Sequence, residues 1–328
     1  MEQQDNQLFG ITTGDSSGVG PEILLRAYQG GEIRQPFVAY GDIEVLEHYN
    51  RLLNYGVALR VIGSPSEYQP GLNVIDHGIL HDGDVTPGRL SAVSGRAARE
   101  YVISATKAAL AGEIAAMVTL PMNKEATQLS DPRFTGHTEL IGELCGAKDV
   151  TIMLASEQLI VTHVSTHMSL RNAIRAAKKK RICTILRLTT DAVRKLIPNP
   201  RIAVAGLNPH AGENGLFGDE EIREIRPAVE WAQSQGMPVE GPFPPDTVFY
   251  MAVRKKRFDA IVCMYHDQGH VPLKLLDFEG GVNIALGLPI IRTSVDHGTA
   301  FDIAGKGVAS TVSLIRAIEF AGKLAKAG

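Results

Sequence analysis

The sequence predicts an α/β fold in which a parallel or mixed sheet is covered by helices on both faces. Short runs rich in Val and Ile alternate along the chain with longer segments of helical periodicity, which is the pattern of such folds. The 328 residues are enough for two domains or for one large α/β domain. No long Gly/Ser/Pro linker interrupts the pattern, so two domains would be joined through ordered elements.

The first elements are a strand at residues 8–12, a Gly-rich turn, and a helix that Pro21 opens. Proline suits a first helical turn because its missing N–H would have no partner there. The clearest helix spans 89–110, where Ala98, Val102 and Ala105 recur at three- and four-residue spacing. The remaining expected strands are 36–40, 115–119, 151–155 paired with 159–163 as a hairpin, 201–205 and 260–264, and the remaining helices are 43–55, 169–196, 222–235 and 310–325.

Composition excludes several classes of protein. The 33 Lys and Arg against 36 Asp and Glu give a net charge of -3, which makes no electrostatic case for nucleic acid or an anionic membrane. Three cysteines cannot form a disulfide framework, and the apolar runs are too short to span a bilayer. The N-terminus lacks the basic and apolar regions of a signal peptide. We therefore expect a cytoplasmic protein.

The first turn, residues 14–22, has three readings. Its backbone N–H groups could face an anion, because the turn follows a strand and precedes a helix. Residues 14–18 also match GxSxG, which would make Ser16 the nucleophile of a serine hydrolase, with Asp296 and His297 as partners. A nucleophile elbow after the first strand, with no oxyanion loop before it, is atypical. The third reading is a Gly turn that only reverses the chain.

Three histidines follow the carboxyl ends of expected strands. His167, His210 and His266 each lie in a Ser-, Pro- or Gly-marked loop at that position, where open α/β sheets bind ligands. Converging imidazoles would form an open metal site with room for substrate, and imidazole suits zinc, cobalt, nickel or iron. Each histidine taken alone also fits a capping or packing role.

Two cations stand inside apolar stretches. Lys274 and Arg292 must be paired if buried, or must meet an anionic ligand. One reading is a structural salt bridge. The other is a bidentate clamp by Arg292 on carboxylate or phosphate, with Lys274 as a second anion contact or proton carrier.

Taken together, eight segments in order along the chain closely resemble the PdxA family of NAD-dependent dehydrogenases; they are 14–22, 119–124, 136–139, 163–167, 207–212, 264–274, 281–283 and 287–305. The resemblance implies two α/β/α domains around a cleft in a homodimer, similar to isocitrate and isopropylmalate dehydrogenases. It implies NAD binding without a Rossmann fingerprint and assigns no NAD-contacting residue. The expected domains are 1–130 with 290–328, and 131–289, which carries the metal site.

The resemblance also implies the site residues. A divalent metal (Zn, Co or Mg) would be held by His167, His210 and His266, with His266 supplied across the homodimer. Lys274 and Asp246 are the expected catalytic residues. The substrate contacts fall on His137, Thr138, Lys274, Asn283 and Arg292.

Two departures from the family pattern bear on the substrate. Ser16 and Ser17 replace Pro-Ala in the first turn, and residues 214–218 read N-G-L-F-G where the type enzymes have G-G-H-M-G. The second version resembles paralogues that oxidise the 3-hydroxyl of D-threonate 4-phosphate and then lose carbon dioxide. We therefore favour that substrate, with 4-hydroxythreonine 4-phosphate second and aromatic cis-dihydrodiol carboxylates third.

Overall fold

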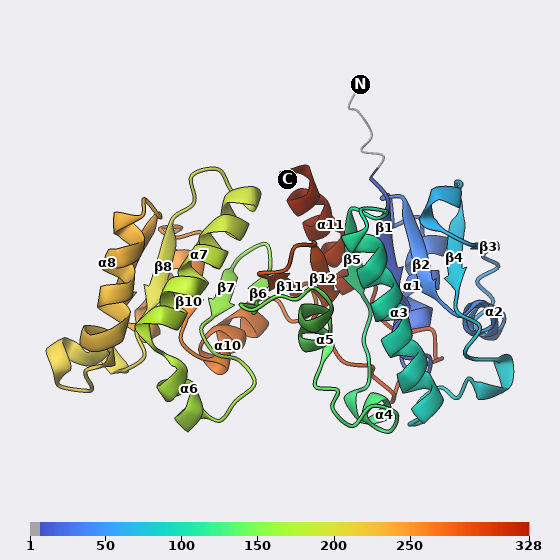
Figure 1. Ribbon diagram of the computed structural model, residues 1–328, viewed down its shortest axis with the longest axis horizontal. Helices are drawn as coiled ribbons and strands as arrows, with labels where there is room; N and C mark the ends of the chain where they lie inside the picture. Colours follow the sequence, from blue (N-terminus) through green and yellow to red (C-terminus); the bar gives the residue numbers. More distant parts are fainter. Residues whose placement is uncertain (1–6, 328) are drawn as a thin grey trace. The chain divides into compact units, whose positions relative to one another are not determined.

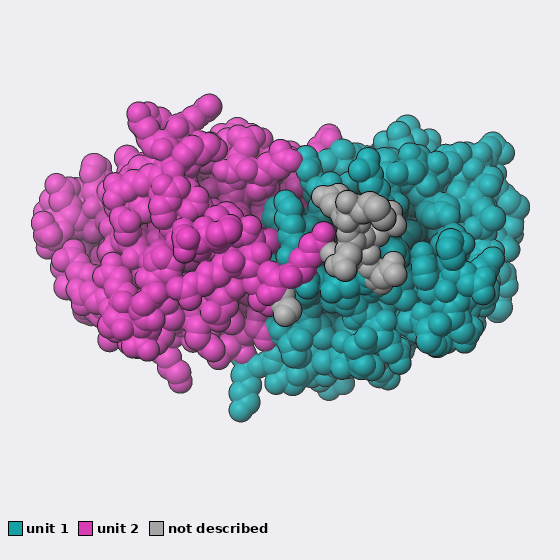
Figure 2. All heavy atoms as spheres, turned by 90° about the horizontal axis from the view of Figure 1, so that it is seen from above, with its two compact units in different colours: residues 1–148, 288–325 teal, residues 149–287, 326–328 magenta. Residues whose placement is uncertain are grey.

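The computed structural model describes residues 7–327, which divide into two compact units, coloured separately in Figure 2. Unit 1 comprises Met1–Lys148 and Leu288–Ala325, and unit 2 comprises Asp149–Gly287 and Lys326–Gly328. The expected limits were 130/131 and 289/290. The first limit of the structure lies further along the chain because helix α5 (His137–Leu144) packs on α3 (Ala92–Leu110) of unit 1.

Unit 1 contains a parallel sheet in the order β3-β4-β2-β1-β5-β12. The central strand β1 is buried throughout, as expected for a parallel strand covered on both faces. The strands are β1 (Phe9–Thr12), β2 (Phe37–Gly41), β3 (Leu59–Ile62), β4 (Leu72–Asp76), β5 (Ala116–Thr119) and β12 (Arg292–Val295).

Helix α3 packs on the strands of unit 1 and contacts the neighbouring short helix α4 (Lys124–Gln128) (Figure 1). Ser91 caps α3 by accepting from the Ser94 N–H, and the Ala-rich face turns inward. Gly95 permits the close approach of α4, because a Cβ there would lie 2.3 Å from the carbonyl carbon of Ala126. The other helices of this unit are α1 (Gly20–Gln29), α2 (Ile43–Leu52) and α11 (Val312–Lys326), with 3-10 turns at Pro65–Glu67 and Asp82–Asp84.

Unit 2 contains a mixed sheet in the order β11-β6-β7-β10-β8-β9. The expected hairpin is confirmed, since β6 and β7 pair antiparallel, and β11 pairs antiparallel with β6. The other three ladders are parallel. The strands are β6 (Thr151–Ala155), β7 (Ile160–His163), β8 (Ile202–Ala205), β9 (Val239–Phe243), β10 (Ala260–Cys263) and β11 (Val282–Leu286).

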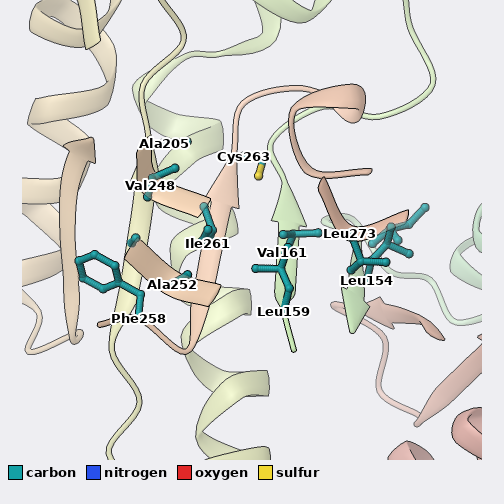
Figure 3. Close-up of a cluster of buried hydrophobic side chains, with 12 residues drawn as sticks. Leu154, Leu159, Val161, Ala205, Val248, Ala252, Phe258, Ile261, Cys263 and Leu273 are labelled. Carbon is teal, nitrogen blue, oxygen red and sulfur yellow. The ribbon is translucent and has the colours of Figure 1, made fainter. Parts of the chain in front are cut away.

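One face of the unit 2 sheet packs against α9 (Pro245–Val253) and α10 (His266–Leu276). Figure 3 shows this apolar cluster, with Val161 and Ile261 of the sheet among its members and Val248 and Leu273 from the two helices. The opposite face meets α7 (Lys179–Leu196), where the Thr162 and Thr189 hydroxyls hydrogen-bond at 2.8 Å. The strands that lead to the candidate site are thus held on both sides.

The segment expected as one helix over 169–196 is two helices, α6 (Leu170–Ala176) and α7, because Ala177 leaves the helical region with φ -72° and ψ 61°. The expected helix at 222–235 is a π turn, Glu221–Ile225, that continues into α8 (Arg226–Ser234). The α/β class is confirmed. No helix among residues 7–327 is both long and apolar enough to cross a bilayer.

Candidate functional site

The three predicted metal-ligating histidines follow three neighbouring strands of unit 2. Strand β10 lies between β7 and β8, and both pairings are parallel, so the three carboxyl ends share one edge of the sheet. His167 follows β7, His210 lies in the turn η3 (Pro209–Gly215) after β8, and His266 begins α10 after β10. All three are at least partly exposed, so their rings are accessible to a ligand.

His167 and His266 come together in the described structure. Their ring centres are 5.6 Å apart, and both line a pocket of about 310 Å³ together with Thr166, Met168, Leu170, Ala173, Tyr265 and Asp267. Two imidazoles on one tetrahedral metal place their ring centres about 5–6 Å apart, given bonds of about 2.0–2.1 Å. The Nδ1–H of His266 donates to the Asp267 carboxylate at 2.6 Å, which leaves its Nε2 for a ligand.

His210 is held in an unusual backbone conformation. The five residues 210–214 all have positive φ, with values of 53, 52, 75, 40 and 56°. Only glycine enters this left-handed region without steric cost, and four of the five residues are not glycine. Within residues 7–327, no three His, Cys, Asp or Glu side chains of one chain are close enough to hold a metal together. The structure therefore pairs His167 with His266 and leaves the assignment of His210 a prediction.

The buried carboxylate of Glu221 anchors the segment that carries His210. Glu221 is 1% exposed, and its Oε1 accepts the N–H groups of Leu207 and Asn208, each at 2.7 Å. Its Oε2 accepts from the Asn208 side-chain amide at 2.8 Å. These three hydrogen bonds fix Leu207 and Asn208, directly before the strained turn. Glu221 could not be picked out from the sequence, because nothing in its local pattern separates it from a solvated helix residue.

A second pair of histidines lies beneath the site. The His163 Nε2 is 3.2 Å from the His270 Nδ1, and the ring of His270 stacks on that of His266 at 3.5 Å. Gly269 makes this approach possible, since a Cβ there would lie 2.5 Å from the His163 Nε2. Burial, reinforced by the neighbouring His270, lowers the pKa of His163 to about 3, so its ring is neutral at physiological pH.

Unit 1 carries a separate cationic group. Arg292, at 2% exposure, begins β12 and donates to the Thr119 hydroxyl from its Nε at 3.2 Å and from an Nη at 2.7 Å. Burial lowers the pKa of Arg292 to about 10, so it is charged at neutral pH. His137 begins α5 as predicted, and its buried Nε2 has no hydrogen-bond partner in the structure. Burial and the nearby charges of Arg292 and Lys124 hold the pKa of His137 well below its usual range.

The other predicted residues are divided between the units. Thr138 lies beside His137 in unit 1, partly exposed. Lys274, on α10 of unit 2, is half-buried, with its Nζ 5.2 Å from the centre of the Phe278 ring. Asn283 is partly exposed on β11, and Asp246 is exposed in the first turn of α9.

Ser16 does not present a nucleophile. It is 1% exposed, and its hydroxyl lies 2.7 Å from that of Ser94, which in turn donates to the Asp15 carboxylate. Burial raises the pKa of Asp15, against the hydrogen bonds that lower it. The three side chains form an internal polar cluster that joins the first turn to α3. This arrangement gives a structural reason for the serine residues and offers no path from the Ser16 hydroxyl to a substrate.

The fold and the site define a two-unit α/β protein with an imidazole pocket at the carboxyl edge of one sheet and a buried arginine in the other unit. Residues 32–321 match the family model described as pyridoxal phosphate biosynthetic protein PdxA. The chain therefore belongs to the PdxA family.

Two curated relatives of nearly equal similarity carry different names. The D-threonate 4-phosphate dehydrogenase of Cupriavidus necator is 46% identical over 326 residues, covering 97% of both chains. The 4-hydroxythreonine-4-phosphate dehydrogenase of Beijerinckia indica is 45% identical over 320 residues, covering 96% of this chain and 94% of its own. A solved structure from Salmonella typhimurium, titled a putative 4-hydroxythreonine-4-phosphate dehydrogenase, is 43% identical with a TM-score of 0.88, covering 98% of this chain and 100% of its own.

Proposed function

We propose that this protein is a dehydrogenase that uses NAD and a divalent metal to oxidise a four-carbon, 4-phosphorylated acid, with D-threonate 4-phosphate as the favoured substrate. In this reaction C3 loses a hydride to NAD and its hydroxyl loses a proton. The resulting 3-keto acid releases C1 as carbon dioxide, C2 takes up a proton, and dihydroxyacetone phosphate remains. The observation that carries the proposal is the His167–His266 pair at the pocket of a PdxA-family chain.

The donor set fits a transition metal such as zinc or cobalt. Imidazole nitrogens would be its ligands here, and the 5.6 Å between the ring centres of His167 and His266 suits joint coordination. When bound, such a metal supplies Lewis acidity that favours ionisation of the substrate hydroxyl and the loss of carbon dioxide. The carboxylate of Asp267 fixes the ring of His266 for this role.

The residues of unit 1 bind the anionic ends of the substrate. Arg292 is held by Thr119 and keeps its charge, so its guanidinium is suited to clamp a phosphate or carboxylate. Neutral His137 contributes a hydrogen bond from its ring rather than a charge, and Thr138 adds a hydroxyl. In unit 2, Lys274 transfers a proton or orients the substrate carboxylate, Asn283 contacts the substrate, and Asp246 is a further polar residue of the reaction.

We further propose that the active form is a homodimer in which a second copy supplies one imidazole. The family resemblance assigns that role to His266. The closeness of His167 and His266 within one chain favours the alternative, in which His210 comes from the second copy.

Mixed dimers separate these assignments. If His266 is the residue supplied in trans, mixing His167→Ala with His266→Ala subunits restores one intact site per dimer. Mixing His167→Ala with His210→Ala subunits then restores none. If His210 is supplied in trans, the two results are reversed. Activity in neither mixture contradicts a shared site.

The second candidate substrate is 4-hydroxythreonine 4-phosphate, the substrate named for the Beijerinckia relative. The N-G-L-F-G segment at 214–218, adjacent to His210, favours the 2-hydroxy acid over the 2-amino acid. NADH formation measured side by side on the two substrates tests this preference. A higher kcat/KM for 4-hydroxythreonine 4-phosphate would overturn it.

A further inference from the structure

We infer that Gln268 is a positioning residue that ties together the segments carrying the three histidines and thereby sets how tightly the site binds a divalent metal. The inference deepens the proposed function and rests on its metal site. Gln268 lies on α10, is 7% exposed, and has no place among the predicted ligands or substrate contacts.

The side-chain amide of Gln268 bridges the ends of two strands. Its Nε2 donates to the carbonyl of Gly206 at 2.7 Å, and its Oε1 accepts from the N–H of Met264 at 2.7 Å. Gly206 directly follows β8 and Met264 directly follows β10, so one amide spans two parallel neighbours where their ladder ends. Both ends of the amide are engaged, which fixes its orientation.

The third strand joins the same network through Met264. The Ser165 hydroxyl donates to the Met264 carbonyl at 2.9 Å, and the Val164 N–H donates to the carbonyl of Cys263 at 2.8 Å. The Met264 backbone thus bonds through its carbonyl to the segment that leads to His167 and through its N–H to Gln268. Gly206 leads in turn toward His210.

Removal of this amide would orphan two buried backbone groups at the base of the site. Gly206 and Met264 are both buried, so neither group gains water in exchange without a shift of the strand ends. Bond lengths between a protein ligand and its metal stay within about 0.2 Å of their usual values. A shift at the strand ends would therefore be transmitted to the imidazoles.

The experiment compares Gln268→Met with wild type and with a matched control. Methionine preserves length and burial but removes both hydrogen bonds. The control, Thr162→Val, removes a fully buried hydrogen bond from β7 on the opposite face of the same sheet, without touching the histidine segments. Zn²⁺ affinity is measured on metal-stripped protein by competition with a chromophoric chelator, and the Co²⁺ absorption spectrum reports ligand geometry.

We expect Zn²⁺ binding to weaken about 10- to 100-fold in Gln268→Met, with an altered Co²⁺ spectrum, because residues that orient metal ligands have effects of this size. Thr162→Val should keep both wild-type properties. If wild type binds Zn²⁺ and Gln268→Met binds it equally well with the same spectrum, the role of Gln268 is refuted while the proposed function stands. If wild type itself does not bind Zn²⁺, the metal site fails and this inference fails with it.

A second variant, Gln268→Glu, tests the inference if Gln268→Met does not fold. Gln268→Glu keeps the acceptor for the Met264 N–H but places a carboxylate oxygen against the Gly206 carbonyl. It should weaken Zn²⁺ binding in the same direction and shift the Co²⁺ spectrum. Wild-type affinity and spectrum in Gln268→Glu would overturn the inference.

Discussion

Replacing Glu221 with glutamine should release the turn that carries His210. The four non-glycine residues at 210, 211, 213 and 214 are left-handed, which costs roughly 1–2 kcal/mol each, or about 4–8 kcal/mol in all. The three hydrogen bonds accepted by Glu221 contribute about 1.5–3 kcal/mol each because the acceptor is charged. The two sums are similar, so the turn depends on this carboxylate.

In the glutamine variant, the side-chain oxygen still accepts from the two backbone N–H groups. Its new NH2 group, however, faces the NH2 group of Asn208, so that hydrogen bond cannot form. One bond is lost and the other two lose their ionic character, a change of about 3–5 kcal/mol. A loss of 3 kcal/mol at the site corresponds to a fall in kcat/KM of about 100-fold. Amide hydrogen exchange over residues 207–218 should accelerate, because the turn opens locally.

Glu220→Gln is the matched control. Glu220 accepts from the Asn208 side chain at 2.7 Å and is partly exposed. Its loss should leave hydrogen exchange in 207–218 and kcat/KM close to wild type. Wild-type kcat/KM and exchange in Glu221→Gln, or equal effects of the two variants, would refute the argument that the buried carboxylate maintains this turn.

Three further outcomes follow from the structure. Arg292→Lys should raise KM about 10- to 100-fold, because lysine cannot bond to Thr119 and clamp an anion at once. Thr119→Val should raise KM less. Equal KM values in Arg292→Lys and wild type would contradict the clamp. The pKa of His163 is about 3 in the folded state and about 6.5 when unfolded. This group should therefore lower the free energy of unfolding by about 1.4 kcal/mol per pH unit as the pH drops from 6.5 toward 3. Urea unfolding of His163→Asn should lack this contribution to the pH dependence, and urea unfolding of the exposed control His297→Asn should retain it. Ser16→Ala should keep the wild-type kcat, and a fluorophosphonate should not label Ser16 in the wild-type protein. Loss of turnover in Ser16→Ala together with labelling of Ser16 would support a serine hydrolase instead.

Much of the fold follows from local patterns. The alternation of short apolar runs with helical periods predicts β1, β5, β8 and β10 to within about two residues, because buried parallel strands read as continuous apolar segments. The β6–β7 hairpin is likewise visible in the sequence. Helix α10 is not, because Pro272 and Gly269 within it resemble a loop. Tertiary packing of Leu273 against the sheet overrides those local preferences.

Some features of the candidate site can be predicted from the sequence and others cannot. The position of a histidine after a strand can be read from the sequence, and so can a cation inside an apolar run, as Arg292 shows. The groups that hold them cannot be read, because Glu221 acts through backbone N–H groups 13 and 14 residues away and Gln268 through a carbonyl 62 residues away. The left-handed turn at 210–214 is equally hidden, since four of its five residues normally avoid that conformation.

The most direct test of the proposed function is NADH formation from D-threonate 4-phosphate by chelator-treated enzyme, with and without added metal. We expect no turnover without metal, recovery with zinc or cobalt, dihydroxyacetone phosphate as product, and no recovery in His210→Ala. Undiminished turnover after complete metal removal, or full activity in His210→Ala, would contradict it.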